Sequence, residues 1–224
     1  EMSASLVGSE MCIRDRDYDD PETYKMLSRG ETEGVFQLES SGMKQVLVGL
    51  QPQNLEDVIA LISLYRPGPM DSIPTYLRNR HEPDKISYKT PQLAHILDVT
   101  NGCIVYQEQV MQIFRELAGF SFGQADNVRR AMSKKKHAVM EAEREHFVHG
   151  CTDPGNECPG CVANGISEKV ANEIYDEMSS FASYAFNKSH AACYAYVAFQ
   201  TAYLKCHYPS EFMAALLTSV PVSY

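Results

Sequence analysis

Apolar residues recur in this chain at three- and four-residue spacing, in short blocks that proline and glycine interrupt. The clearest blocks comprise Met43, Val46, Leu47 and Leu50, and then Leu55, Val58, Ile59 and Ile62. This spacing is typical of amphipathic α-helices. The second helix must end before residues 66–69, Arg-Pro-Gly-Pro, because two prolines around a glycine cannot continue it. A brief strand or extended segment is expected at 35–38 and a short strand at 102–105. The sequence therefore predicts a mainly α fold, a multi-helical domain with a few short β-strands.

Capping residues predict where several other helices begin. Asp20 precedes a proline, and Ser121 and Ser167 precede apolar helical periods, as N-cap residues do. Further helices are expected at 76–81, 106–118, 138–148, 190–207 and 210–219. Together these elements account for most of the chain.

Residues 1–16 differ from the rest of the sequence because they show no clear period. Residues 3–15 resemble a translated sequencing-adapter read-through. We therefore predict that 1–16 are a non-native leader, with an ordinary disordered terminus as the alternative. Residues 17–224 are expected to form the native region and to begin part-way through a domain.

The net charge of −9 would repel nucleic acid, so any contact with DNA or RNA requires a local basic patch. One exists between Val128 and His137, where five Lys or Arg occur without an acid. It includes Arg129, Arg130 and Lys134. We interpret it as a site for a nucleic-acid backbone or a triphosphate, with a solvated helix end as the alternative.

The strongest local motif is Phe-Asn-Lys-Ser-His at 186–190, directly before a helix without charges in its first turns. Asn187, Lys188, Ser189 and His190 all carry hydrogen-bond donors. A helix start adds unpaired backbone N–H groups and the positive end of the helix dipole. The motif therefore predicts a phosphate cradle. The alternative is that Asn187 and Ser189 only cap the helix.

Two further residues are candidate ligand contacts. Arg66 begins the rigid turn at 66–69, and its planar guanidinium could bind a phosphate with two hydrogen bonds. Tyr106 begins the sequence Tyr-Gln-Glu-Gln at 106–109 and could stack on a base. Ordinary helix capping explains that sequence at least as well.

Seven cysteines, with no secretory signal, indicate a reducing cytoplasm rather than a disulfide framework. Cys151, Cys158 and Cys161 lie in a glycine-rich loop at 150–165, which could form a small hairpin. With His149 or His146 they could complete a zinc site. Because the second Cys-x-x-Cys is absent, surface-loop cysteines are the favoured interpretation. No apolar run reaches 18 residues, so no membrane span is predicted.

The sequence shows no Asp-x-Asp pair on apolar strands that would hold two Mg²⁺ ions for nucleotidyl transfer. We therefore expect this chain to bind a triphosphate but not to perform the chemistry alone.

Six motifs occur in an order that resembles a known family. They are Gly-Val-Phe-Gln-Leu-Glu-Ser at 34–40, Arg-Pro-Gly-Pro at 66–69, Tyr-Gln-Glu-Gln-Val-Met at 106–111, Arg-Arg-Ala-Met at 129–132, Phe-Asn-Lys-Ser-His at 186–190 and Tyr-Pro-Ser-Glu-Phe-Met at 208–213. Together they resemble the fingers region of the alpha subunit of bacterial DNA polymerase III, a C-family replicative DNA polymerase. The resemblance extends from about residue 17 to residue 220.

The resemblance implies a DNA-directed DNA polymerase, a cytoplasmic bacterial nucleotidyltransferase of DNA replication. Its fingers bind the incoming dNTP and primer–template DNA, and palm aspartates outside this chain hold two Mg²⁺ ions. A palm, a thumb and contacts to the sliding clamp through other regions are further implied. The fragment alone is expected to be inactive, and no zinc is implied.

The motifs that match the family indicate which residues of this chain would make the family's phosphate contacts. We expect triphosphate or primer–template phosphate contacts from Arg66, Arg129, Arg130, Lys134, Lys188 and His190. Asn187 and Ser189 would add hydrogen bonds, and Tyr106 would lie near the base or sugar. Two alternatives from other classes stay open: a stand-alone nucleic-acid or nucleotide-binding module without chemistry, and a small structural module stabilised by zinc.

Overall fold

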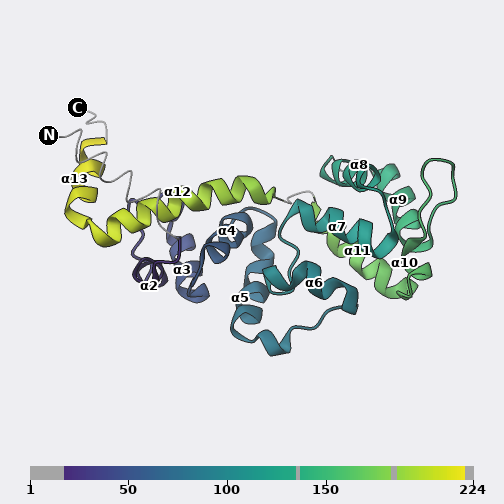
Figure 1. Ribbon diagram of the computed structural model, residues 1–224, viewed down its shortest axis with the longest axis horizontal. Coiled ribbons are helices and arrows are strands. Elements are labelled where there is room, and N and C mark those ends of the chain that lie inside the picture. Colours follow the sequence, from purple (N-terminus) through teal and green to yellow (C-terminus); the bar gives the residue numbers. More distant parts are fainter. Residues whose placement is uncertain (1–17, 135–136, 183–185, 220–224) are drawn as a thin grey trace. The chain divides into compact units, whose positions relative to one another are not determined.

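The computed structural model describes residues 18–134, 137–182 and 186–219 (Figure 1). These ranges are mainly helical, as the sequence predicts. The predicted short strands at 35–38 and 102–105 are wrong. Within the described ranges, β-pairing is limited to isolated bridges, parallel between Tyr106 and Phe186 and antiparallel between Cys151 and Cys158. The segment at 35–38 folds back on itself instead, because the Leu38 N–H donates to the Val35 carbonyl at 3.1 Å.

The chain divides into two compact units, and the division falls within two helices, α4 and α12. Of the described residues, 18–62 and 191–219 belong to the first unit and 63–190 to the second. The predicted leader at 1–16 lies outside the described residues. No helix of the described chain is both long enough and apolar enough to cross a membrane.

The first unit is built from helices of two separate ranges of the chain. They are α2 (Pro21–Ser28), α3 (Ser41–Leu50), most of α4 (Leu55–Leu64), most of α12 (Lys188–His207) and α13 (Pro209–Ser219). The Asp20 carboxylate accepts from the Thr23 N–H at 3.0 Å and begins α2. The Ser40 hydroxyl accepts from the Met43 N–H at 3.3 Å and begins α3. These side chains satisfy N–H groups that have no partner within the helix.

Helix α12 contributes a buried face to the first unit. Its buried face consists largely of alanines, which let neighbouring side chains approach closely: Ala191, Ala195, Ala198 and Ala202. The Phe199 ring lies 5.2 Å from the Tyr24 ring and 5.4 Å from the Tyr18 ring. Farther along, the Lys205 ammonium donates to the Glu33 carbonyl at 2.7 Å. Segments distant in sequence therefore form this core.

Within its described residues, the second unit contains five longer helices joined by short helical turns. The longer helices are α5 (Ile73–His81), α7 (Gln107–Ala118), α8 (Phe122–Ser133), α9 (His137–His149) and α11 (Glu168–Ala182). The short ones are η1 (Pro69–Ser72), η2 (Pro83–Lys85), η3 (Pro91–Leu93), α6 (Ala94–Leu97), η4 (Asp98–Thr100) and α10 (Gly160–Ala163).

The core of the second unit lies among α7, α8, α9 and α11, which pack against one another (Figure 1). Three aromatic side chains form its centre: the Phe114 ring lies 5.0 Å from Phe147 and 6.0 Å from Tyr175. All three are almost fully buried. Burial of aromatic side chains supplies much of the hydrophobic free energy of such a core. The core thus fixes the start of α7, where the candidate site lies.

The predicted glycine- and cysteine-rich loop forms a tight hairpin, as one interpretation of the sequence proposed. Cys151 and Cys158 exchange backbone hydrogen bonds of 2.9 Å in both directions. Gly160 has a φ of +77°, and a Cβ at this position would lie 2.3 Å from the Gly150 nitrogen. Glycine is therefore required at 160 by both the conformation and the close backbone approach.

Candidate functional site

The start of α12 lies against the start of α7. The Asn187 side-chain oxygen accepts from the His190 N–H at 3.1 Å, so Asn187 caps α12 as one interpretation of the sequence proposed. The Lys188 N–H donates to both oxygens of the Glu108 carboxylate, at 3.2 and 3.3 Å. A carboxylate from α7 therefore lies at the positive end of α12.

The backbone joins the same two segments next to this contact. The Gln107 N–H donates to the Phe186 carbonyl at 3.0 Å, beside the parallel bridge between Tyr106 and Phe186. The Lys188 ammonium lies 5.4 Å from the centroid of the Tyr106 ring, within the range of a cation–π interaction. Because Tyr106 is only 2% exposed, its ring packs inside the unit, and its contact with a base or sugar stays a prediction.

Gln109 holds the start of α7 in place. Its side-chain oxygen accepts from the N–H groups of Val105 and Tyr106, at 2.9 and 3.0 Å. Its amide nitrogen donates to the Thr100 hydroxyl at 2.7 Å and to the Ile96 carbonyl at 3.0 Å. This buried network confirms the capping interpretation of the sequence at 106–109. It also fixes the backbone from which Tyr106, Gln107 and Glu108 project.

Arg66 reaches this region from the Arg-Pro-Gly-Pro turn. Its guanidinium carbon lies 4.3 Å from the centroid of the Phe186 ring. The turn depends on Gly68, whose φ of +99° is accessible to glycine at little cost. The Phe186 ring also meets the His190 ring edge to face, with 5.1 Å between the ring centroids. The aromatic ring thus links Arg66 to the start of α12.

Arg129 joins the region from α8. Its guanidinium donates to the Gln107 side-chain oxygen at 2.9 Å and to one Asp126 oxygen at 3.0 and 2.7 Å. Arg130 pairs with the other Asp126 oxygen at 2.7 Å. The hydrogen bond from Arg129 lowers the pKa of Asp126 below its ordinary value. Asp126 is therefore a carboxylate at neutral pH and holds both arginines.

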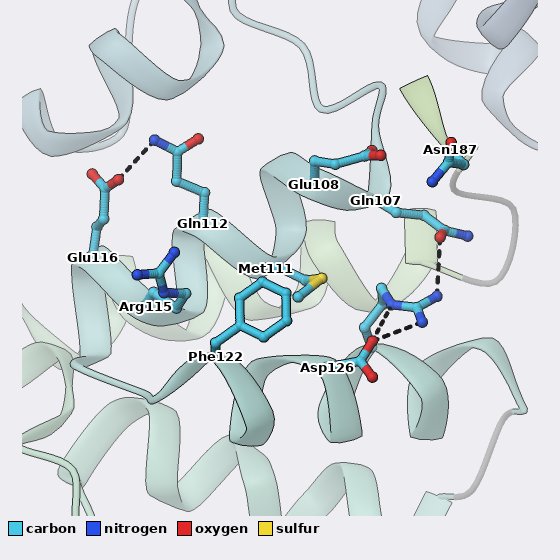
Figure 2. A pocket seen from close by; sticks show the side chains of 10 residues that line it. Gln107, Glu108, Met111, Gln112, Arg115, Glu116, Phe122, Asp126 and Asn187 are labelled. Atoms are coloured by element: carbon cyan, nitrogen blue, oxygen red, sulfur yellow. Dashed lines mark hydrogen bonds and ion pairs between the residues drawn. The ribbon is translucent and has the colours of Figure 1, made fainter. Parts of the chain in front are cut away.

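An open cavity of about 520 Å³ runs along α7 beside these groups. Its lining comprises Gln107, Glu108, Met111, Gln112, Arg115, Glu116, Phe122, Asp126, Arg129 and Asn187. Figure 2 shows Gln107, Glu108 and Asn187 at one end of this cavity and Arg115 and Glu116 at the other. Such a volume matches a small-molecule site in size.

The structure thus connects six of the residues that the sequence singled out, from four separate segments: Arg66, Tyr106, Arg129, Asn187, Lys188 and His190. Arg130 joins them through Asp126. Lys134 is the exposed C-cap residue of α8, and Ser189 is exposed in the first turn of α12. The lysines at 135 and 136 lie outside the described residues.

Sequence reasoning missed three acceptors. Gln107 and Glu108 were visible in the sequence at 106–109 but were interpreted as capping residues. Asp126 lies three and four positions before the two arginines, a spacing that puts it on their face of the helix and could have identified it.

The metal hypotheses find no support in this geometry. Among the described residues, no group of three His, Cys, Asp or Glu side chains is close enough to hold a metal ion. Burial raises the pKa of the Cys161 thiol to about 12. The zinc considered for Cys151, Cys158, Cys161 and His149 stays a hypothesis that this geometry does not support.

The fold and the site define a helical domain in which arginine and lysine side chains meet a helix N-terminus, with Arg129 and Asn187 lining an open cavity. Comparison with known proteins identifies it further. Residues 2–155 match the family model of the bacterial DNA polymerase III alpha subunit finger domain. The chain belongs to this family.

Curated relatives agree with this assignment. The chain is 52% identical over 205 residues to DNA polymerase III subunit alpha of Thermus aquaticus, covering 89% of this chain and 16% of that protein. It is 47% identical over 203 residues to the Staphylococcus epidermidis protein of the same name, covering 91% and 18%. For Staphylococcus aureus strain Mu50 the identity is 45% over 214 residues, covering 96% and 19%. The chain therefore spans less than a fifth of each of these relatives.

Proposed function

We propose that this chain supplies the nucleotide-binding fingers of a bacterial replicative DNA polymerase. In this proposal Arg66, Arg129 and the segment 186–190 bind the triphosphate of an incoming dNTP and phosphates of primer–template DNA. Further contacts with these phosphates come from three exposed residues, Arg130, Lys134 and Ser189. The two Mg²⁺ ions and the catalytic carboxylates belong to residues outside the described chain.

One observation carries the proposal: contacts through Phe186 and Gln107 link Arg66, Arg129 and the start of α12, and Arg129 and Asn187 line one open cavity. Each donor type suits a phosphate oxygen. Guanidinium groups bind phosphate with paired hydrogen bonds, and helix-terminal N–H groups complement negative charge. A net charge of −9 makes such a concentration of donors unusual for this chain and favours a specific anionic ligand.

The remaining proposals concern the whole protein. Together with the rest of the polymerase subunit, its palm and its thumb, the chain takes part in template-directed addition of deoxynucleotides to a primer. The sliding clamp is a partner through other regions of the subunit, and the bacterial cytoplasm is the site of action. By itself the fragment has no polymerase activity.

The test is Lys188→Ala in the full-length polymerase, with steady-state kinetics of nucleotide incorporation. Loss of a charged hydrogen-bonding group from a phosphate site costs about 1.5–3 kcal/mol, so kcat/KM for dNTP should fall roughly 10- to 100-fold. The matched control is Lys85→Ala in the same unit, because the Lys85 side chain is 74% exposed and pairs with Glu82 on the surface. Wild-type kinetics in Lys188→Ala would contradict the assignment.

A further inference from the structure

The positive end of α12 carries an anion that belongs to the protein itself. Glu108 is the second residue of α7, and both of its carboxylate oxygens lie within 3.3 Å of the Lys188 nitrogen. The Lys188 ammonium lies 5.4 Å from the centroid of the neighbouring Tyr106 ring. The carboxylate thus occupies the place where the proposed function puts a phosphate.

Asp126 repeats this arrangement on the other wall of the cavity. Its two oxygens pair with Arg129 and Arg130, the residues expected to bind phosphate from α8. The two acids and Arg129 line the same cavity (Figure 2). The principal phosphate donors therefore already bind carboxylates of the chain.

Of the two acids, Glu108 is the one that a ligand can replace. Asp126 lies within hydrogen-bonding distance of both arginines and is on their own helix, so it stays with them when they bind. Glu108 comes from a different helix than Lys188 and is an exposed residue. It can leave the α12 terminus by side-chain rotation alone, without any change in either helix.

We propose that Glu108 is an internal competitor for the phosphate subsite at the start of α12, and that a polyphosphate must displace it to bind. The inference rests on the proposed function and names a residue that sets the affinity of that site. Competition of this kind multiplies the apparent dissociation constant by the reciprocal of the fraction of molecules whose subsite is open. Weakly held phosphates are thereby excluded, whereas a triphosphate with further contacts to the arginines still binds.

The experiment compares Glu108→Gln with wild type in the full-length polymerase bound to a dideoxy-terminated primer–template. The amide oxygen of glutamine can still accept from the Lys188 N–H, so the helix cap is kept while the charge is removed. We expect the equilibrium Kd for the next dNTP to fall about threefold to tenfold. The inhibition constant of inorganic pyrophosphate should fall by a similar factor, because both ligands need the same subsite.

Glu116→Gln is the matched control. Glu116 lies on the same helix and lines the same cavity, but its oxygens pair with Gln112 and His95. The control therefore removes the same charge from the same cavity without touching α12, and its Kd for dNTP should change less than about twofold. Glu108→Asp, which keeps the charge, should stay closer to wild type than Glu108→Gln.

The outcomes separate the inference from the function on which it rests. If Glu108→Gln leaves the Kd unchanged or raises it, while Lys188→Ala weakens dNTP binding, the competitor role is overturned and the proposed function stands. If Glu116→Gln tightens dNTP binding as much as Glu108→Gln, the loss of any negative charge from the cavity explains the change. The competitor role of Glu108 is then also overturned. If Lys188→Ala does not affect dNTP binding, the proposed function fails and the inference fails with it.

Discussion

The guanidinium of Arg66 lies over the ring of Phe186, with 4.3 Å between the guanidinium carbon and the ring centroid. Arg66 belongs to the Arg-Pro-Gly-Pro turn and Phe186 to the segment that leads into α12. A guanidinium that lies over an aromatic ring keeps its edge N–H groups available for other acceptors. The contact therefore holds Arg66 in place without using up its donors.

From this contact we predict that Phe186→Leu in the full-length polymerase lowers kcat/KM for dNTP about twofold to fivefold. The reason is that a cation–π interaction at a partly exposed site contributes about 0.5–1 kcal/mol, and leucine offers no aromatic face. Steady-state kinetics provides the measurement. Phe186→Tyr, which keeps the ring, should remain near wild type. Equal losses in the two variants would show that the ring face has no role.

A second prediction concerns the buried network around Gln109. Gln109→Ala leaves two backbone N–H groups, at Val105 and Tyr106, without their side-chain acceptor. We expect the free energy of unfolding of the 224-residue chain to fall by about 2–4 kcal/mol, because unsatisfied buried donors are costly. Urea unfolding followed by circular dichroism measures it.

The control for Gln109 is Gln112→Ala, one turn farther along α7. Gln112 is only half-buried and donates to the Glu116 carboxylate at the surface. Its replacement should change the free energy of unfolding by less than about 0.5 kcal/mol. If Gln109→Ala and Gln112→Ala had the same free energy of unfolding, the Gln109 network would not hold the start of α7.

The starts of α2 and α8 could be predicted from the sequence because each signal is local. Asp20 and Ser121 each accept a hydrogen bond from an N–H three residues later. The start of α12 was predicted at His190 but lies at Lys188. A local signal was present here as well, because the Asn187 side chain accepts from the His190 N–H and caps α12. The contact between the Lys188 N–H and the Glu108 carboxylate leaves no local pattern, because it joins residues far apart in the sequence.

The same distinction applies to the strands and to the site. Short extended segments become strands only when a neighbouring segment pairs with them, and 35–38 bonds to itself instead. At the site, Arg66 and Lys188 were predictable as donors because charge and position near a helix end are readable from sequence. Their partners Phe186 and Glu108 were not, because folding alone brings these side chains to them.

The last prediction follows from the lowered pKa of Asp126. A hydrogen bond from Arg129 is the main cause, and the charges of Arg129 and Arg130 add to it. Because the pKa of the folded state lies below that of the unfolded state, the unfolded chain binds the proton first as pH falls. The stabilisation by this carboxylate is therefore fully present above about pH 4 and is lost as the pH falls through the folded-state pKa.

The measurement is the difference in free energy of unfolding between wild type and Asp126→Asn. Because the carboxylate is partly exposed, solvent screening limits this difference to about 0.3–1 kcal/mol near pH 7. It should shrink as the pH falls through the folded-state pKa, because the carboxyl group is protonated in both states only below that pKa. Asp84→Asn, at an exposed position in η2, should show no such pH-dependent difference. A difference that persisted undiminished as the pH fell through this range would mean that the carboxylate charge does not hold Arg129 and Arg130, and that shape or hydrogen bonding alone positions them.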